Sequence, residues 1–159
     1  MSQILIALSL WLHSLATVIM IGHYLLLAVI HIPTLKKSRL EVAGPILSEI
    51  SKRSRSYLYV SLLVFMVTGI YLMFVNPSYL GIGDFGNLWS IMMLLKHTLI
   101  MGMIGAGFFF NAILRVGPML SSRNGADQAF KRFELHVNIM AIGGVWVLLF
   151  TALAQMQSG

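Results

Sequence analysis

The chain carries ionisable side chains inside long apolar segments, where they are energetically costly and usually serve a function. The segment from Trp11 to Thr34, WLHSLATVIMIGHYLLLAVIHIPT, holds three of the five histidines, and no charged side chain precedes Lys36. The full set comprises His13, His23, His31, Lys96, His97 and His136. Because imidazoles bind metal ions and haem iron, the set predicts a metal or cofactor site.

The composition indicates an integral membrane protein. Of 159 residues, 58% are hydrophobic and 10% are charged, whereas soluble domains have about 25% charged residues. The chain has no cysteine, which excludes disulfides, thiolate metal sites and iron-sulfur clusters. The sequence pI is near 10.0, but the basic residues are divided between loops. We therefore expect a lipid bilayer, and no nucleic acid, as the partner of this surface.

Four apolar segments are long enough to cross a bilayer as helices, and they cover residues 4–32, 57–75, 88–114 and 133–156. Short connections favour a single all-α transmembrane domain over residues 1–159, a four-helix bundle with up-down-up-down topology. The sequence does not indicate an oligomeric state.

The basic residues predict the orientation of these spans. All but one of the 11 Lys and Arg residues lie near 36–55 and 115–132, which makes both loops cytoplasmic and both termini outer or periplasmic in a bacterial-type inner membrane. In the first loop, Leu40, Ile46, Leu47 and Ile50 are spaced for a short surface helix. A basic loop that only sets orientation is the simpler interpretation.

The rise per residue of an α-helix gives the depth of each histidine within its span, and histidines at similar depths can face each other. His13 and His97 each fall about 6 to 8 Å to the outer side of their span centres, so they can meet. His23 lies about 8 Å on the inner side, His136 about 11 to 13 Å, and His31 lies deeper at the inner boundary. Facing imidazoles in a four-helix bundle commonly hold haem b. The sequence therefore predicts an outer haem on His13 and His97, and a second haem on His23 or His31 with His136.

Lys96 is the one basic residue inside a span, about 12 Å from the outer end of its helix. Burial at that depth costs about 2.5 to 3.5 kcal/mol on insertion scales, and snorkelling to the surface explains it poorly. We expect Lys96 to act in catalysis or to place charge near a haem propionate or a quinone-like substrate. Glu134 and Asn111, near the inner boundary, suit ion pairing with Arg115 or Arg132, or proton relay.

Methionine supports a competing hypothesis of copper transport. Met93, His97 and Met101 repeat at every fourth position, and soft Cu(I) accepts thioether and imidazole ligands. Methionine is also an ordinary apolar residue of membrane helices. Glycines such as Gly22, Gly102 and Gly143 allow close approach of either a flat ring or another helix.

The chain resembles the membrane domain of the copper-resistance protein D family and, more distantly, the small bacterial membrane protoporphyrinogen oxidases. The matching residues are His13, Gly22 and Pro33 in the first span, Lys96 and Asn111 in the third, and Glu134 and Gly143 in the fourth. The resemblance covers about three of the four spans. It implies a four-helix membrane unit and, on the oxidase side, haem b with essential residues at His13 and Lys96.

The chain also departs from the pattern of that family. Met20 replaces the tryptophan and His23 the second glycine of the first span, and His97 and His136 have no counterpart. The extra histidines favour an electron-transferring b-type cytochrome with a separate redox partner protein. The enzymatic alternative is a protoporphyrinogen oxidase-like oxidoreductase, in which a porphyrin enters from the lipid and Lys96 steers its carboxylates.

Overall fold

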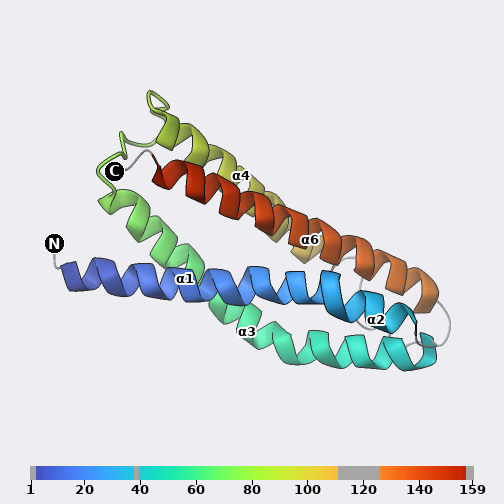
Figure 1. Cartoon of the computed structure of the whole chain (residues 1–159). Coiled ribbons are helices and arrows are strands. Elements are labelled where there is room, and N and C mark those ends of the chain that lie inside the picture. The colour runs from blue at the N-terminus through green and yellow to red at the C-terminus, as the bar shows by residue number, and fades with distance from the viewer. Residues whose placement is uncertain (1–2, 38–39, 111–125, 157–159) are drawn as a thin grey trace.

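The computed structural model describes residues 3–37, 40–110 and 126–156, and these residues form helices and connections without a strand. In chain order the elements are α1 (Gln3–Leu26), the π-helical turn η1 (Leu27–His31), α2 (Ile32–Lys36), α3 (Leu40–Val75), α4 (Leu88–Phe108) and α6 (Ala126–Gln155). Figure 1 shows the start of α1, the end of α6 and the connection between α3 and α4 at the same end of the molecule.

Four helical stretches in the described ranges are long and apolar enough to cross a membrane: Gln3–Lys36, Ala43–Val75, Leu88–Phe108 and Asp127–Gln155. The expectation of a helical chain with four segments able to span a membrane is thereby confirmed for the described residues. The third predicted span ends at residue 114, and its last residues, with Asn111, lie outside the described residues.

The helices extend beyond the apolar segments of the sequence. α3 begins at Leu40, so much of the first basic connection is helical rather than a loop. The extension is held because Ala43 and Leu47 are fully buried in a cluster with Leu27 of η1 and Ala129 of α6. Burial of one apolar face stabilises a helix whose opposite face is charged. Hydropathy averaged along the chain does not detect such a helix, because the apolar and charged residues cancel in the average.

The first span is bent into a π-helical turn ahead of Pro33. Proline has no N–H to donate to the carbonyl of Val29, and its ring clashes with that carbonyl, so the backbone widens by one residue. The hydroxyl of Thr34 donates to the carbonyl of Ile30 at 2.7 Å and so satisfies an acceptor in this turn. The span therefore stays helical through the bend.

The helices pack mainly as two pairs, α1 with α3 and α4 with α6, and contacts between α1 and α6 join the pairs (Figure 1). Two adjacent glycines of α6 allow this close approach. A Cβ on Gly143 would lie 2.9 Å from the sulfur of Met103 in α4, and a Cβ on Gly144 would lie 2.9 Å from Cγ2 of Ile21 in α1. Both glycines thus serve helix packing, which is one of the two uses expected for small residues.

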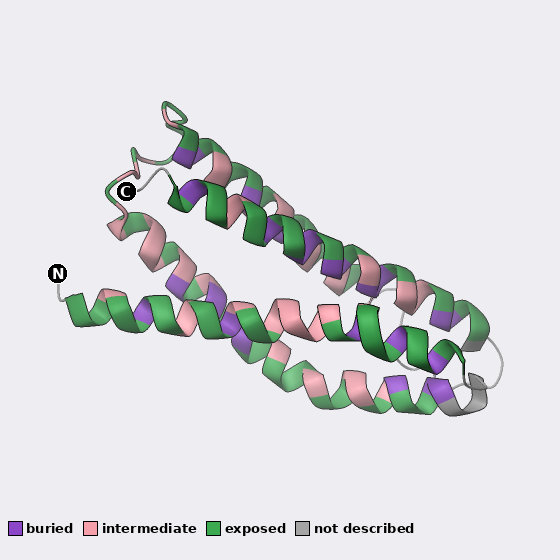
Figure 2. Ribbon diagram, in the orientation of Figure 1, coloured by how far each residue is buried: buried purple, intermediate pink, exposed green. Residues whose placement is uncertain are grey.

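Buried residues run along the middle of the bundle, and the outer surfaces of the helices are largely apolar and exposed (Figure 2). Val18, Ile30 and Leu63 are examples of exposed apolar side chains. This distribution suits a chain surrounded by lipid, because hydrocarbon solvates such side chains. The polar groups buried inside are therefore the exceptions that need an explanation.

Candidate functional site

Two cavities lie inside the bundle, and each is lined by α1, α3, α4 and α6. One has a volume of about 150 Å³ and lies toward the chain termini, and the other has about 500 Å³. We call them the outer and inner cavity after the orientation that the sequence predicts. Phe65 and Ile100 line both cavities and belong to a buried cluster with Ala16 and Val147. A thin apolar layer therefore separates the two spaces.

The outer cavity brings together His13 of α1 with Lys96 and His97 of α4. Lys96 is only 8% exposed. The ion pairs within the described ranges join Lys36 to Glu134 and Arg53 to Glu49, so no described carboxylate neutralises Lys96. A lysine and two imidazoles thus share a cavity without a described acidic partner.

His13 is held in a fixed orientation by three neighbours on α3. Its ring stacks on Phe65 with centroids 4.4 Å apart, and its Nδ1 lies 3.0 Å from Oγ1 of Thr68. A Cβ on Gly69 would lie 3.0 Å from its Cε1. With the Thr68 hydroxyl donating its hydrogen to the carbonyl of Val64 at 2.6 Å, its oxygen is left to accept from Nδ1–H of His13. In the neutral ring the lone pair is therefore on Nε2.

His97 has the same tautomer for a similar reason. Its Nδ1 lies 2.7 Å from the carbonyl oxygen of Met93, which can only accept, so Nδ1 carries the hydrogen. A second-shell acceptor on Nδ1 is the usual arrangement for a histidine that uses Nε2 as a ligand or base. Both imidazoles of the outer cavity are therefore hydrogen-bond acceptors at Nε2.

The predicted trio Met93, His97 and Met101 does not converge. Met93 and His97 line the outer cavity, but Met101 is 59% exposed. Eight residues of α-helix turn through about 800°, so Met101 is rotated about 80° from Met93. Met66 and Met73 of α3 line the cavity in its place. Sequence spacing along one helix gave no signal for these two residues, because they belong to another helix.

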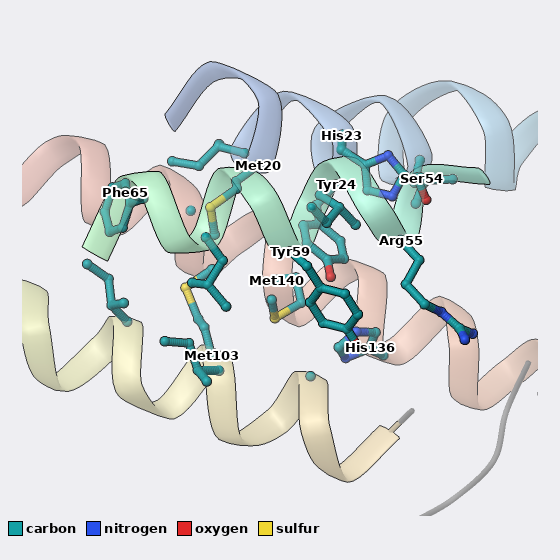
Figure 3. Close-up of a pocket in the computed structure, with 18 of the residues that line it drawn as sticks. Met20, His23, Tyr24, Ser54, Arg55, Tyr59, Phe65, Met103, His136 and Met140 are labelled. Atoms are coloured by element: carbon teal, nitrogen blue, oxygen red, sulfur yellow. The ribbon is translucent and has the colours of Figure 1, made fainter. Parts of the chain in front are cut away.

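The inner cavity brings together His23 of α1 and His136 of α6 (Figure 3). The ring of Tyr24 contacts both, with centroids 5.3 Å from His23 and 5.8 Å from His136. Tyr59 and Arg55 of α3 also line this cavity, together with Ser51 and Ser54. The inner cavity thus has polar residues from three helices in a mainly apolar wall, to which Gly107 and Gly144 also contribute.

His136 has an unsatisfied nitrogen. The residue is 5% exposed, and its buried Nδ1 has no hydrogen-bond partner in the described part of the chain. Its ring lies against Phe110, with centroids 4.5 Å apart. A buried polar atom without a partner costs about 1 to 3 kcal/mol. Such an atom in a residue that lines a cavity requires an explanation.

His31, the alternative to His23, is exposed and lines neither cavity. Glu134 bonds to Lys36 at 2.5 Å, which ties α2 to α6. Arg115, one of its two expected partners, lies outside the described residues. In the ranges that the structure describes, no three His, Cys, Asp or Glu side chains form a metal-binding group.

Comparison with known proteins adds no assignment, since no family model, curated protein or solved structure matches the chain. The resemblance to the copper-resistance protein D family and the membrane protoporphyrinogen oxidases stays a prediction. The two cavities are therefore the features of the chain that indicate its function.

Proposed function

We propose that the chain is a b-type haem protein of a bacterial-type inner membrane and that it transfers electrons to a partner protein. Its spans run up-down-up-down, with the basic connections in the cytoplasm and both termini outside. The clustering of Lys and Arg at alternate connections supports this orientation. A C-terminal tag that a protease reaches only from the cytoplasm would contradict it.

His136 is the observation that carries the haem proposal, because this buried histidine lines the inner cavity and its Nδ1 has no hydrogen-bond partner in the described part of the chain. The volume of about 500 Å³ lies within the range of about 300 to 1,000 Å³ that small-molecule and cofactor sites occupy. A histidine in the wall of a large apolar space suits an axial ligand of haem iron. When bound, haem b carries one electron at a time by cycling between ferric and ferrous iron.

Other residues of the inner cavity fit the same ligand. His23 approaches from α1 while His136 approaches from α6. Arg55 with the hydroxyls of Ser51 and Ser54 offers donors for the two carboxylates of a haem. Tyr24 contacts both imidazoles, so a shared iron requires its ring to turn aside. In this proposal Arg55 holds the carboxylates and Tyr24 acts as a mobile wall.

The cavity volumes reverse the ranking that the sequence suggests for the two histidine pairs. The outer cavity has about 150 Å³, a size that holds roughly one benzene ring. Phe65, Thr68 and Gly69 pack directly on His13, so a macrocycle between His13 and His97 needs the helices to separate. We therefore assign the haem to the inner cavity and a different role to the outer cavity.

A difference spectrum of the purified protein, reduced with dithionite minus oxidised, tests the proposal. We expect the α-band of a six-coordinate haem b, and its absence from protein expressed with haem supplementation would refute the assignment. Arg55→Gln should weaken haem binding, followed as loss during dialysis, by about tenfold or more, because a charge-assisted hydrogen bond contributes about 1.5 to 3 kcal/mol. Arg53→Gln is the matched control, since Arg53 pairs with Glu49 on the surface.

Copper binding is the second candidate, and the composition of the outer cavity favours it. Three methionines, Met66, Met73 and Met93, line this cavity with His13 and His97. Thioether and imidazole ligands suit Cu(I), although the neighbouring ammonium of Lys96 opposes a cation. Anaerobic titration with Cu(I) should then show one site that Met66→Leu and Met93→Leu weaken and Met101→Leu does not.

Porphyrinogen oxidation is less well supported by the geometry. His13 and Lys96, the two positions that the resemblance implies for this activity, do share a cavity. That cavity has about 150 Å³, and the cavity with room for a macrocycle is lined by neither residue. Loss of protoporphyrinogen oxidation by membranes containing Lys96→Met, with haem content unchanged, would instead favour the enzyme.

A further inference from the structure

The outer cavity has a combination of features that the haem proposal does not use. It has about 150 Å³, it contains a buried lysine, and its two imidazoles present acceptors rather than donors. We propose that the outer cavity binds the ring of a lipid-soluble hydroquinone, whose hydroxyl groups hydrogen-bond to His13, His97 and Lys96.

The volume of the outer cavity limits its ligand to a single small ring. A protein cavity of about 150 Å³ lined by apolar side chains holds benzene. The outer cavity has the same volume, and its apolar wall includes Phe65, Met66, Met73 and Trp89. Aromatic and thioether groups contact aromatic rings favourably. One six-membered ring therefore fits, and a macrocycle does not.

The hydrogen-bond pattern selects a ring that can donate. Because the Nδ1 hydrogens of His13 and His97 are already used by Thr68 and the Met93 carbonyl, the neutral rings offer only the lone pair of Nε2. A quinone has carbonyl oxygens and cannot donate to these atoms, whereas a hydroquinone has two hydroxyls. Each hydroxyl oxygen also accepts a hydrogen bond from an ammonium such as Lys96.

The cavity is placed where such a ligand occurs. It lies within the spans of an apolar chain, so a ligand dissolved in the lipid reaches it more readily than a water-soluble one. Phe65 and Ile100 form the layer between it and the inner cavity. The inference extends the proposed electron-transfer function, since a reductant bound here would lie next to the haem site, but the binding itself does not depend on haem.

The test measures binding at the cavity wall by ¹⁹F NMR of protein labelled with 5-fluorotryptophan. The chain has three tryptophans, of which Trp89 lines the outer cavity and is 3% exposed, while Trp11 and Trp146 are exposed references. The ligands are methylhydroquinone and 1,2,4-trimethylbenzene under argon. These two molecules have nearly the same shape, but only the first has hydroxyl groups.

We expect methylhydroquinone to shift the Trp89 resonance with saturation, whether or not the protein contains haem. Lys96→Met and His97→Phe should each raise its half-saturating concentration by about tenfold, as expected for a lost hydrogen bond to a charged or buried group. The same variants should leave trimethylbenzene binding unchanged or make it tighter. Lys131→Met, at an exposed residue of α6, is the control.

Two results would overturn the inference. The first is a Trp89 resonance that does not move while the references respond to ligand in the micelle. The second is a Trp89 shift in the unsubstituted protein that is equal for both ligands. The comparison of the two ligands uses only the unsubstituted protein, so the inference can be tested even if a variant misfolds. If protein expressed with haem supplementation contains no haem but still binds methylhydroquinone, the proposed haem function is refuted and this site is retained.

Discussion

Gly69→Ala tests whether the packing of α3 fixes His13. The added methyl would lie 3.0 Å from Cε1 and 3.6 Å from Nδ1 of His13. The imidazole cannot move away freely, because it stacks on Phe65 and bonds to Thr68. We expect the substitution to break the Thr68 bond and disturb the stacking, which together contribute about 1 to 3 kcal/mol.

Gly102→Ala is the matched control for this change. Gly102 is an exposed helical residue, and a Cβ there would meet nothing within 4 Å. Alanine improves helix propensity by about 0.8 to 1 kcal/mol at either position, so this gain cancels between the variants. Reversible unfolding in mixed micelles, followed by circular dichroism, should show Gly69→Ala to be less stable than Gly102→Ala by about 2 kcal/mol. Equal stabilities would refute the orientation of His13 described above.

Three further predictions follow from other contacts. Gly144→Ala should lower the unfolding free energy more than Gly143→Ala, because the first methyl meets the stiff β-branched Ile21 and the second meets the flexible Met103. Thermal unfolding of both variants tests this order, and the reverse order would contradict the packing. Lys36→Gln should cost about 0.2 to 1 kcal/mol at low salt and less at high salt, as for a solvent-accessible ion pair with Glu134; an effect independent of salt would exclude that origin. His136→Phe should stabilise haem-free protein by about 1 kcal/mol, because it removes an unsatisfied buried nitrogen, and exposed His31→Phe should show no such gain.

The sequence was sufficient to predict the four spans and the shared cavity of His13, Lys96 and His97. The apolar runs and the depth arithmetic depend only on helical rise, which varies little between proteins. The same arithmetic grouped His136 with His23 or His31, and of these two His23 lines the inner cavity with His136. The position of a residue along its helix axis can therefore be predicted from a single sequence.

The direction in which a side chain points around its helix axis, and the contacts between helices, could not be predicted from the sequence in the same way. Met101 shares a repeat with Met93 but is turned toward the outside, and Met66 enters the outer cavity from another helix. Thr68 and Gly69 resemble ordinary residues of an apolar helix, although together they fix His13. In the sequence, Arg55 indicates only the orientation of the chain in the membrane. Its place in the wall of the inner cavity depends on the continuation of α3 through the first connection, which hydropathy does not show.

The most direct test of the haem assignment compares the dithionite-reduced minus oxidised spectra of His136→Ala and His97→Ala with that of the unsubstituted protein. If haem b occupies the inner cavity, His136→Ala loses the α-band or converts it to a high-spin form, and His97→Ala retains it. Retention of the band in His136→Ala with its loss in His97→Ala would contradict the assignment and return the haem to the outer pair.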